Sequence, residues 1–318
     1  MEQRIPEIVK KEFEANVLEI KRITEGYSHY MYEVKIDKSS EIIIIRFSNN
    51  IKNTCNLGKE KYIIDLLSQN NIPAPRILAF YFSEDKKEEG YMILEKIKGI
   101  RLDTIWNSLD KEEKIKITKK IGEFLSKIHQ IKLKEFGSIE QDGKINSDLA
   151  FKFRSVGETL EYSLFLRNKL KEDFIDLARL LSYKILNPEF VAKLVYYLSK
   201  NLDKFDYEGE PTLIHNDFMI GHLFVDKINR EYEIVGIIDF EFASSYSPEY
   251  DFIKLHRQGF FDDIELKKAL KEGYGEINEK ALEIHRLTRD VAFAWTMLES
   301  GNKKLAEETL QKVEKRLD

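Results

Sequence analysis

The chain has 318 residues, and its 56 acidic residues outnumber its 51 basic ones, which gives a formal net charge of −5. A hydrophobic content of 42% and an aromatic content of 12% are enough for a packed core and exclude an intrinsically disordered chain. A slightly acidic protein has no field that would hold nucleic acid nonspecifically, because such binding needs many basic side chains on phosphates. The length indicates two domains or one body with two lobes.

Cysteine usage and hydropathy indicate the compartment. The single cysteine, Cys55, excludes an internal disulfide framework and any metal site built from several thiolates. The longest aliphatic run, Ile42–Ile45, is far shorter than the ~20 residues needed to cross a bilayer. The first residues mix charged and apolar side chains and lack the apolar segment of a signal peptide. We therefore expect a cytoplasmic protein without a membrane partner, either monomeric or weakly dimeric.

The N-terminal part of the chain is predicted to be rich in β-strands. Residues 1–18 read as a short amphipathic helix, and Asn56–Gln69 reads as a second helix that the prolines of Ile72–Pro75 bring to an end. Runs rich in Ile, Val and Tyr predict strands at Glu19–Thr24, Tyr30–Ile36, Glu41–Phe47, Arg76–Phe82 and Tyr91–Lys96. The first three of these strands are separated by short turns, so we expect them to pair antiparallel.

Helical patterns dominate after Gly99. They predict helices at Asp110–Gln130, Asp148–Leu186 and Pro188–Leu202, and again from Pro248 to Asp318. A strand–loop–strand unit, Pro211–Val225 and Tyr232–Phe240, interrupts this helical part. The chain is therefore expected to be an α+β protein with a small β-rich N-terminal lobe, residues 1–97, and a larger helical C-terminal lobe, residues 98–318.

The strand–loop–strand unit carries the side chains best suited to chemistry. Each apolar strand delivers a carboxylate to the loop that follows it, Asp217 after the first strand and Asp239 after the second. His222 follows Asp217 in the same loop. Two carboxylates and an imidazole that return to one place suit proton acceptance and the binding of a divalent metal. The alternative is a pair of ordinary loop-capping aspartates and a packed histidine.

This unit resembles the catalytic and metal-binding loops of the aminoglycoside phosphotransferase family, which is related to choline kinase and to the protein kinases. His215-Asn216-Asp217 stands where that family has His-Gly-Asp, and Ile238-Asp239-Phe240 is similar to its Ile-Asp-Phe/Trp motif. His222 stands where the family usually has asparagine, and in this it is similar to the aminoglycoside 2″-phosphotransferases and the macrolide kinases. The resemblance implies a bilobal, protein-kinase-like fold with the active site between the lobes.

The resemblance extends over most of the chain and implies a nucleotide site in the N-terminal lobe. Arg46 stands in the third-strand segment that normally carries a lysine, and Glu60 stands in the helix whose glutamate pairs with that cation. A guanidinium keeps the charge but differs in geometry from an ammonium. The alternative is that Arg46 and Glu60 are ordinary surface residues. The nucleotide-binding residues that the resemblance implies are Gly26 and Ser28 of the covering loop, Arg46, Glu60, and Leu94, Glu95 and Ile97 of the hinge.

The resemblance also implies a mechanism. Phosphoryl transfer needs in-line alignment of the reactants and neutralisation of phosphate charge. Asp217 is expected to accept the proton of the acceptor hydroxyl, while Asp239 and His222 hold Mg²⁺. His215 and Asp251 are expected to fix the loop rather than to take part in the reaction. Backbone groups of the hinge are expected to bind the purine, which leaves ATP and GTP both open as the phosphate donor.

We predict that the chain transfers the γ-phosphate of ATP or GTP to a hydroxyl of an aminoglycoside-type antibiotic, which is a cationic small molecule. Carboxylates near the metal loop could bind such a cation, namely Glu241, Glu249, Asp262 and Asp263. The basic segment Lys254–Gln258 argues against a cationic acceptor. The alternatives are a kinase of another small alcohol (a macrolide, a choline-like compound or a sugar metabolite) and a nucleotide-binding module without transfer activity.

Overall fold

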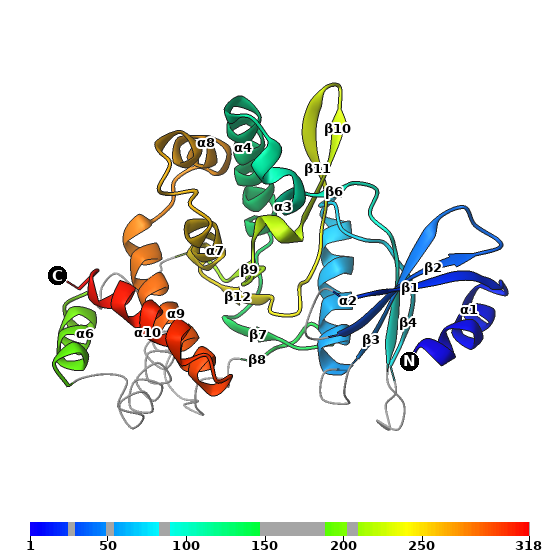
Figure 1. Cartoon of the computed structure of the whole chain (residues 1–318), viewed down its shortest axis with the longest axis horizontal. Coiled ribbons are helices and arrows are strands. Elements are labelled where there is room, and N and C mark those ends of the chain that lie inside the picture. The colour runs from blue at the N-terminus through cyan, green and yellow to red at the C-terminus, as the bar shows by residue number, and fades with distance from the viewer. Residues whose placement is uncertain (25–28, 49–53, 83–89, 147–187, 202–208, 318) are drawn as a thin grey trace.

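A computed structural model describes residues 1–24, 29–48, 54–82, 90–146, 188–201 and 209–317 (Figure 1). Two of the residues expected to cover the nucleotide, Gly26 and Ser28, lie outside the described residues, as does the helix predicted at Asp148–Leu186.

The N-terminal part is built around a five-stranded antiparallel sheet. Its strands are β1 (Val17–Ile23), β2 (His29–Ile36), β3 (Ile42–Ser48), β4 (Ile77–Tyr81) and β5 (Tyr91–Glu95), in the order β1-β2-β3-β5-β4. All five lie where the runs rich in Ile, Val and Tyr predict them, within one or two residues. A 3₁₀ turn, η1 (Glu2–Arg4), and the helix α1 (Ile5–Phe13) precede the sheet, and α2 (Thr54–Gln69) follows β3.

The two helices cover opposite faces of this sheet, because successive residues of a strand point to opposite sides. Ile5 and Val9 of α1 pack with Ile45 and Phe47 of β3, whereas Leu57 and Ile64 of α2 pack with Met92 and Leu94 of β5. In the register of β3 and β5, Arg46 is paired with Met92 and Ile44 with Leu94. Arg46 and Leu94 therefore lie on the face that α2 covers.

The C-terminal part is mainly helical and surrounds the largest apolar core. Its helices are α3 (Leu102–Ile105), α4 (Lys111–His129), α6 (Pro188–Lys200), α7 (Phe252–Arg257), α8 (Ile264–Tyr274), α9 (Glu279–Glu299) and α10 (Lys303–Glu314), with 3₁₀ turns η3 (Trp106–Ser108), η6 (Ile220–His222) and η7 (Pro248–Asp251). Helix α4 begins where it is predicted to begin, because Asp110 and Glu113 form a reciprocal capping box. Apolar side chains of α6, α9 and α10 form a second cluster.

Two glycines set the distance between α4 and α8. A Cβ atom built on Gly122 would lie 2.4 Å from the carbonyl oxygen of Leu270, and one built on Gly273 would lie 2.0 Å from that of Lys119. Both distances are far below van der Waals contact, so each helix backbone rests on the other at a residue without a side chain.

Gly273→Ala is therefore expected to destabilise the protein by about 1–3 kcal/mol, because the helices must separate to admit the methyl group. This loss exceeds the ~1 kcal/mol that alanine gains over glycine in helix propensity. Urea unfolding of the variant and of wild type measures the difference. Glu272→Ala, at an exposed position of the same helix, is the control and should change stability by less than about 1 kcal/mol. Equal stability of Gly273→Ala and wild type would contradict the packing argument.

The predicted strand–loop–strand unit is divided between two small sheets. The first segment breaks into β9 (Thr212–Ile214), a loop, and β10 (Leu223–Ile228), and the second segment is β11 (Glu231–Ile237). β10 pairs with β11 and with β6 (Ile100–Arg101). β9 pairs instead with β12 (Ser244–Tyr246), which continues to β7 (Gly137–Ile139) and β8 (Ile145–Asn146). The first strand ends before Asp217, as predicted, and the polar loop that follows it leads the chain to the other sheet.

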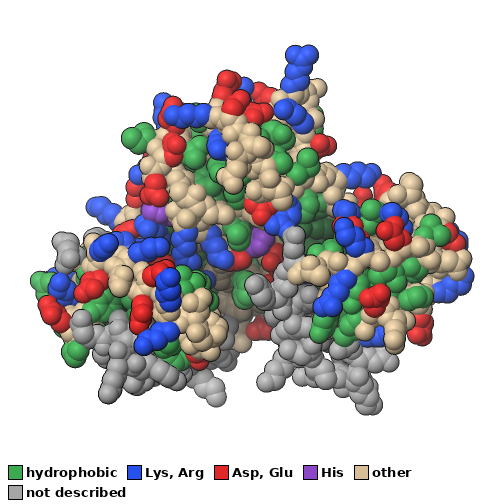
Figure 2. Space-filling model, viewed as in Figure 1, with side chains coloured by type: hydrophobic (Ala, Val, Ile, Leu, Met, Phe, Trp, Pro, Cys, Tyr) green, Lys and Arg blue, Asp and Glu red, His purple; other side chains and the backbone are tan. Residues whose placement is uncertain are grey.

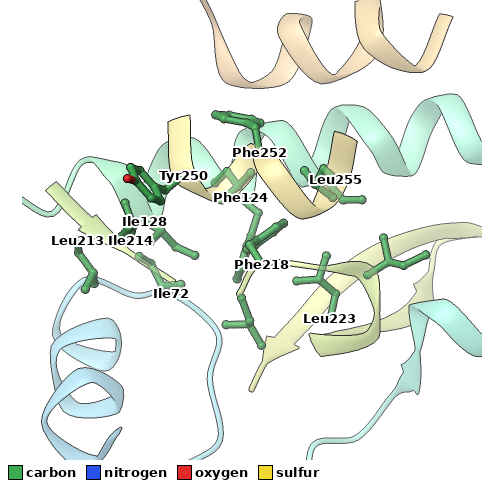
Figure 3. Close-up of a cluster of buried hydrophobic side chains, with 14 of the residues drawn as sticks. Ile72, Phe124, Ile128, Leu213, Ile214, Phe218, Leu223, Tyr250, Phe252 and Leu255 are labelled. Carbon is green, nitrogen blue, oxygen red and sulfur yellow. The ribbon is translucent and has the colours of Figure 1, made fainter. Parts of the chain in front are cut away.

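The largest apolar cluster lies directly behind this loop. Leu213, Ile214 and Phe218 are buried in one cluster with Phe124 of α4 and Phe252 of α7 (Figure 3). Ile63 and Leu67 of α2 belong to the same cluster, so the core continues from the helical part to the underside of the N-terminal sheet. The loop is thus placed on a rigid support at the junction of the two parts.

No helix among the described residues is long and apolar enough to cross a membrane. The α+β organisation predicted from the sequence is confirmed: a β-rich N-terminal part precedes a mainly helical C-terminal part. The boundary at residue 97 remains a prediction.

Candidate functional site

The loop that carries Asp217 is held by its backbone. It begins where β9 ends, at His215, and Asn216 takes a left-handed conformation with φ of 62°. Asparagine tolerates that region better than most residues with a side chain. The backbone N–H groups of His215 and Asn216 donate to the two carboxylate oxygens of Asp251, at 2.8 and 2.6 Å. The prediction that Asp251 fixes the loop is confirmed.

Asp251 is itself held by a histidine from another helix. It is 1% exposed, and Nε2 of His129, the last residue of α4, lies 3.1 Å from its Oδ2. Nδ1 of His129 lies 2.9 Å from the hydroxyl of Tyr274 in α8. A proton on Nε2 lets the imidazole donate to the carboxylate and accept from the hydroxyl, which satisfies both contacts. The sequence shows no connection between His129 and this loop, because only the packing of α4 and α8 brings them together.

His215 joins the loop of Asp217 to the loop of Asp239. Its Nε2 donates to the carbonyl oxygen of Ile238 at 2.9 Å, and its Nδ1 accepts from the N–H of Asp217 at 3.3 Å. Its ring packs on Phe240, with 4.5 Å between ring centroids. The predicted structural role of His215 is confirmed.

Asp217, His222 and Asp239 come together at the junction, as the sequence predicts. Nδ1 of His222 donates to the backbone carbonyl of Asp217 at 3.0 Å and lies 4.0 Å from its carboxylate Oδ2. This tautomer leaves a lone pair on Nε2, which lies 3.5 Å from Oδ2 of Asp239. Burial lowers the pKa of the His222 imidazole, which favours this neutral form.

The pair of His222 and Asp239 fits a divalent cation. A neutral imidazole nitrogen and a carboxylate oxygen 3.5 Å apart are both metal donors, and one ion can contact both. No group of three or more His, Cys, Asp or Glu side chains in the described part of the chain could hold a metal. A metal at this pair would therefore complete its coordination with phosphate oxygens and water, which is how Mg²⁺ is usually bound beside a nucleotide.

The predicted ion pair of Arg46 and Glu60 is confirmed. Nη1 of Arg46 lies 2.5 Å from Oε1 of Glu60, and the two residues are 6% and 1% exposed. Nη2 of Arg46 lies 4.0 Å from Oδ1 of Asp239. Nε of Arg46 is buried and has no hydrogen-bond acceptor among the described residues. A buried donor left in this position suits an incoming phosphate oxygen.

The hinge follows β5, which pairs with the strand that carries Arg46. Leu94 lies on the same sheet face as Arg46, and the N–H of Glu95 donates to the carbonyl oxygen of Arg76 at 2.9 Å. That N–H is therefore engaged within the sheet, and a contribution of Glu95 to purine binding must come from its carbonyl oxygen. Ile97 packs on Gly236 of β11, where a Cβ atom would lie 2.7 Å from its Cδ1. The hinge thus rests on the strand that leads to Asp239.

One site residue was not predicted from the sequence. Lys254 of α7 forms an ion pair with Oδ1 of Asp217. The available signal is its position three residues after Asp251, because one helical turn returns a side chain to the face occupied by the loop. In the sequence, the basic segment Lys254–Gln258 indicates only a charge unfavourable to a cationic acceptor.

The carboxylates expected to bind a cationic acceptor are partly engaged elsewhere. Glu249 is buried and hydrogen-bonded to the hydroxyl of Ser247. Asp263 caps α8 by accepting from the N–H groups of Glu265 and Leu266. Each of these two carboxylates thus satisfies a local structural need, and their contribution to an acceptor site stays a prediction. Lys and Arg side chains instead gather over α7 and the neighbouring end of α9 (Figure 2).

The sheet lies beside the helical part, and a buried cation and two carboxylates meet at the junction of the two. This is the architecture of kinase-like phosphotransferases. A model described as "Phosphotransferase enzyme family" matches residues 19–286, and the chain belongs to this family. The family assigns it a phosphotransferase activity with an alcohol group as acceptor.

Solved structures share the fold over nearly the whole chain. The GDP complex of wild-type aminoglycoside 2'-phosphotransferase-IIIa is 14% identical with a TM-score of 0.69, covering 99% of this chain and 98% of that one. The GDP and kanamycin complex of APH(2")-IIia is 15% identical with a TM-score of 0.67, covering 98% and 97%. Macrolide 2'-phosphotransferase type I is 12% identical with a TM-score of 0.60, covering 98% and 96%. These likenesses confirm the predicted kinase-like fold.

Proposed function

We propose that the chain transfers the γ-phosphate of ATP or GTP to a hydroxyl of a small molecule. The observation that carries this proposal is the position of Asp239. Its Oδ1 lies 4.0 Å from Arg46 of the N-terminal sheet, and its Oδ2 lies 3.5 Å from His222 of the other loop. A carboxylate between a phosphate-binding cation and a metal-binding imidazole suits a nucleotide triphosphate with its metal ion.

In this proposal, each residue of the site has a separate role in phosphoryl transfer. Asp217 orients the acceptor hydroxyl and accepts its proton, while Arg46, fixed by Glu60, binds the α- and β-phosphates. Mg²⁺ bound by Asp239 and His222 would neutralise charge on the phosphates. The purine lies beside Leu94 and bonds to the backbone of Glu95 and Ile97. Gly26 and Ser28 cover the phosphates in this proposal, with residues 1–97 as the nucleotide-binding lobe and residues 98–318 as the catalytic and substrate-binding lobe.

Two classes of acceptor follow. An aminoglycoside-type antibiotic is supported by the solved complex of a protein of the same fold with GDP and kanamycin. Another small alcohol (a macrolide, a choline-like compound or a sugar metabolite) is favoured by the geometry, since Lys254 contacts Asp217 and both Glu249 and Asp263 are engaged structurally. The cysteine usage suits a cytoplasmic enzyme, and we expect a monomer or weak dimer that needs neither nucleic acid nor a membrane.

Thermal unfolding of the full chain with ATP or GTP, with and without Mg²⁺ or Mn²⁺, tests the nucleotide site. We expect a rise in Tm that needs both nucleotide and metal, because Asp239 and His222 would hold the metal and the metal would neutralise charge on the phosphates. Release of nucleoside diphosphate is then followed with kanamycin, gentamicin, a macrolide, choline and sugar alcohols as acceptors. Growth of a sensitive bacterium expressing the chain on these antibiotics checks the first acceptor class. A protein that neither binds the nucleotides nor releases diphosphate would refute the proposal.

A further inference from the structure

Lys254 lies against the carboxylate of Asp217, the proposed proton acceptor. Its ammonium group contacts Oδ1 of Asp217, whereas the other oxygen, Oδ2, is the one that lies 4.0 Å from Nδ1 of His222. The lysine thus contacts the oxygen that does not face the candidate metal ligands. A substrate that reaches Asp217 on this side must meet the ammonium group.

The backbone of Lys254 is fixed relative to the loop that carries Asp217. Helix α7 begins directly after Asp251, whose carboxylate accepts from the N–H groups of His215 and Asn216. The residue that shapes the loop is therefore one helical turn away from the lysine. The four-carbon side chain of lysine still allows its ammonium group to move by a few ångströms. The helix therefore fixes the backbone of Lys254, while its side chain lets the ammonium group move within the site.

Neighbouring cations are engaged with carboxylates that have no part in the reaction. Arg257 pairs with Asp290, and Nη1 of Arg286 lies 2.7 Å from Oε2 of Glu283. Within the described residues, the ion pair of Lys254 is made with Asp217. Asp217 must turn an oxygen to the acceptor hydroxyl before it can accept the proton. At that moment the ammonium group needs another anion, and the anion that arrives there is the γ-phosphoryl group.

We propose that Lys254 is a catalytic residue that contacts the transferring phosphoryl group from the acceptor side, an inference that rests on the proposed function. The bond between the γ-phosphorus and the β–γ bridging oxygen breaks, and its electron pair leaves with the nucleoside diphosphate. A bond forms between the phosphorus and the acceptor oxygen, whose proton passes to Asp217. Lys254 stays protonated throughout.

The physical reason is the distribution of charge in the transition state. Negative charge lies on the three equatorial oxygens of the transferring group, and a cation already in place stabilises it without reorganisation. Arg46 lies in the N-terminal sheet, where it contacts Glu60 and lies 4.0 Å from Asp239. It would therefore contact the phosphates from the opposite side. Lys254 supplies charge from the helical part.

Lys254→Met, Lys254→Gln and Lys254→Arg test this assignment, with Lys304→Met on the exposed surface of α10 as control. The first readout is hydrolysis of MgATP and MgGTP without acceptor, in which water replaces the alcohol. The second is the affinity for ADP with Mg²⁺, alone and with fluoroaluminate, which mimics the transferring phosphoryl group. We expect the Met and Gln variants to lose about 10²–10³ in kcat. Their Kd for ADP alone should stay within about twofold of wild type, because Lys254 acts on the transferring group.

The fluoroaluminate-dependent gain in ADP affinity should disappear in the Met and Gln variants and return in part with arginine, which keeps the charge. The side chain of Lys254 is 36% exposed, so we expect all three variants to fold. A normal kcat and a normal fluoroaluminate gain in Lys254→Met would overturn the assignment. Absence of both hydrolysis and the fluoroaluminate gain in wild type would instead refute the proposed function itself.

Discussion

Asp217→Asn is expected to lower kcat by about 10²–10⁴, the range that a positioned general base contributes. Asparagine has the shape of aspartate but cannot accept the proton of the acceptor hydroxyl. The loop should keep its conformation, because it is held through the N–H groups of His215 and Asn216 and not through the Asp217 side chain. Nucleotide affinity should therefore remain within about twofold of wild type, since Arg46 and Asp239 are untouched.

The measurement is diphosphate release under saturating nucleotide, together with the Kd of nucleotide from calorimetry. Asp226→Asn, at an exposed position of β10, makes the same chemical change away from the site and is the matched control. If Asp217→Asn retained more than a tenth of the wild-type kcat, Asp217 would not be the proton acceptor.

Glu60→Leu should destabilise the protein by about 3–5 kcal/mol, because it leaves the Arg46 guanidinium buried without its carboxylate. Arg46 is 6% exposed, so water cannot replace the lost partner, and Asp239 lies 4.0 Å away. The double variant Arg46→Met/Glu60→Leu should recover most of this loss, since a buried apolar pair leaves no charge without a partner.

Urea unfolding of wild type, Arg46→Met, Glu60→Leu and the double variant measures the four free energies of unfolding that this double-mutant comparison needs. Asp65→Ala on the same helix breaks the exposed pair of Lys61 and Asp65 and should cost at most about 1 kcal/mol. A double variant less stable than Glu60→Leu would show that the ion pair is not the reason for the destabilisation.

The sequence predicts those parts of the molecule that local patterns determine. The five strands of the N-terminal sheet are rich in Ile, Val, Tyr and other apolar residues and are long enough to be recognised. The strands β6, β7 and β12 have two or three residues each, and they pair with strands far along the chain. Such strands exist only because the surrounding helices bring their partners together, so no window of sequence contains the signal.

The residues of the candidate site also fall into those that a local motif predicts and those that only tertiary packing brings together. Asp217, His222 and Asp239 belong to one motif with fixed spacing, and the pairing of Arg46 with Glu60 follows from the same resemblance. The contacts of Asp251 with His129 and of Asp217 with Lys254 depend on how α4 and α7 pack around the loop. Tertiary contacts of this kind become visible only when the helices are placed.

The attachment of the loop to Asp251 has a consequence for how this site can diversify. Because Asp251 binds the backbone N–H groups of His215 and Asn216, this anchor of the loop does not depend on which side chains those two positions carry. Substitutions there can change the chemistry while the framework stays intact. Asn216 in place of glycine and His222 in place of asparagine are two such replacements, and both residues lie in an ordered loop. A single carboxylate outside the loop thus gives natural variation room to explore new acceptors at little cost in stability.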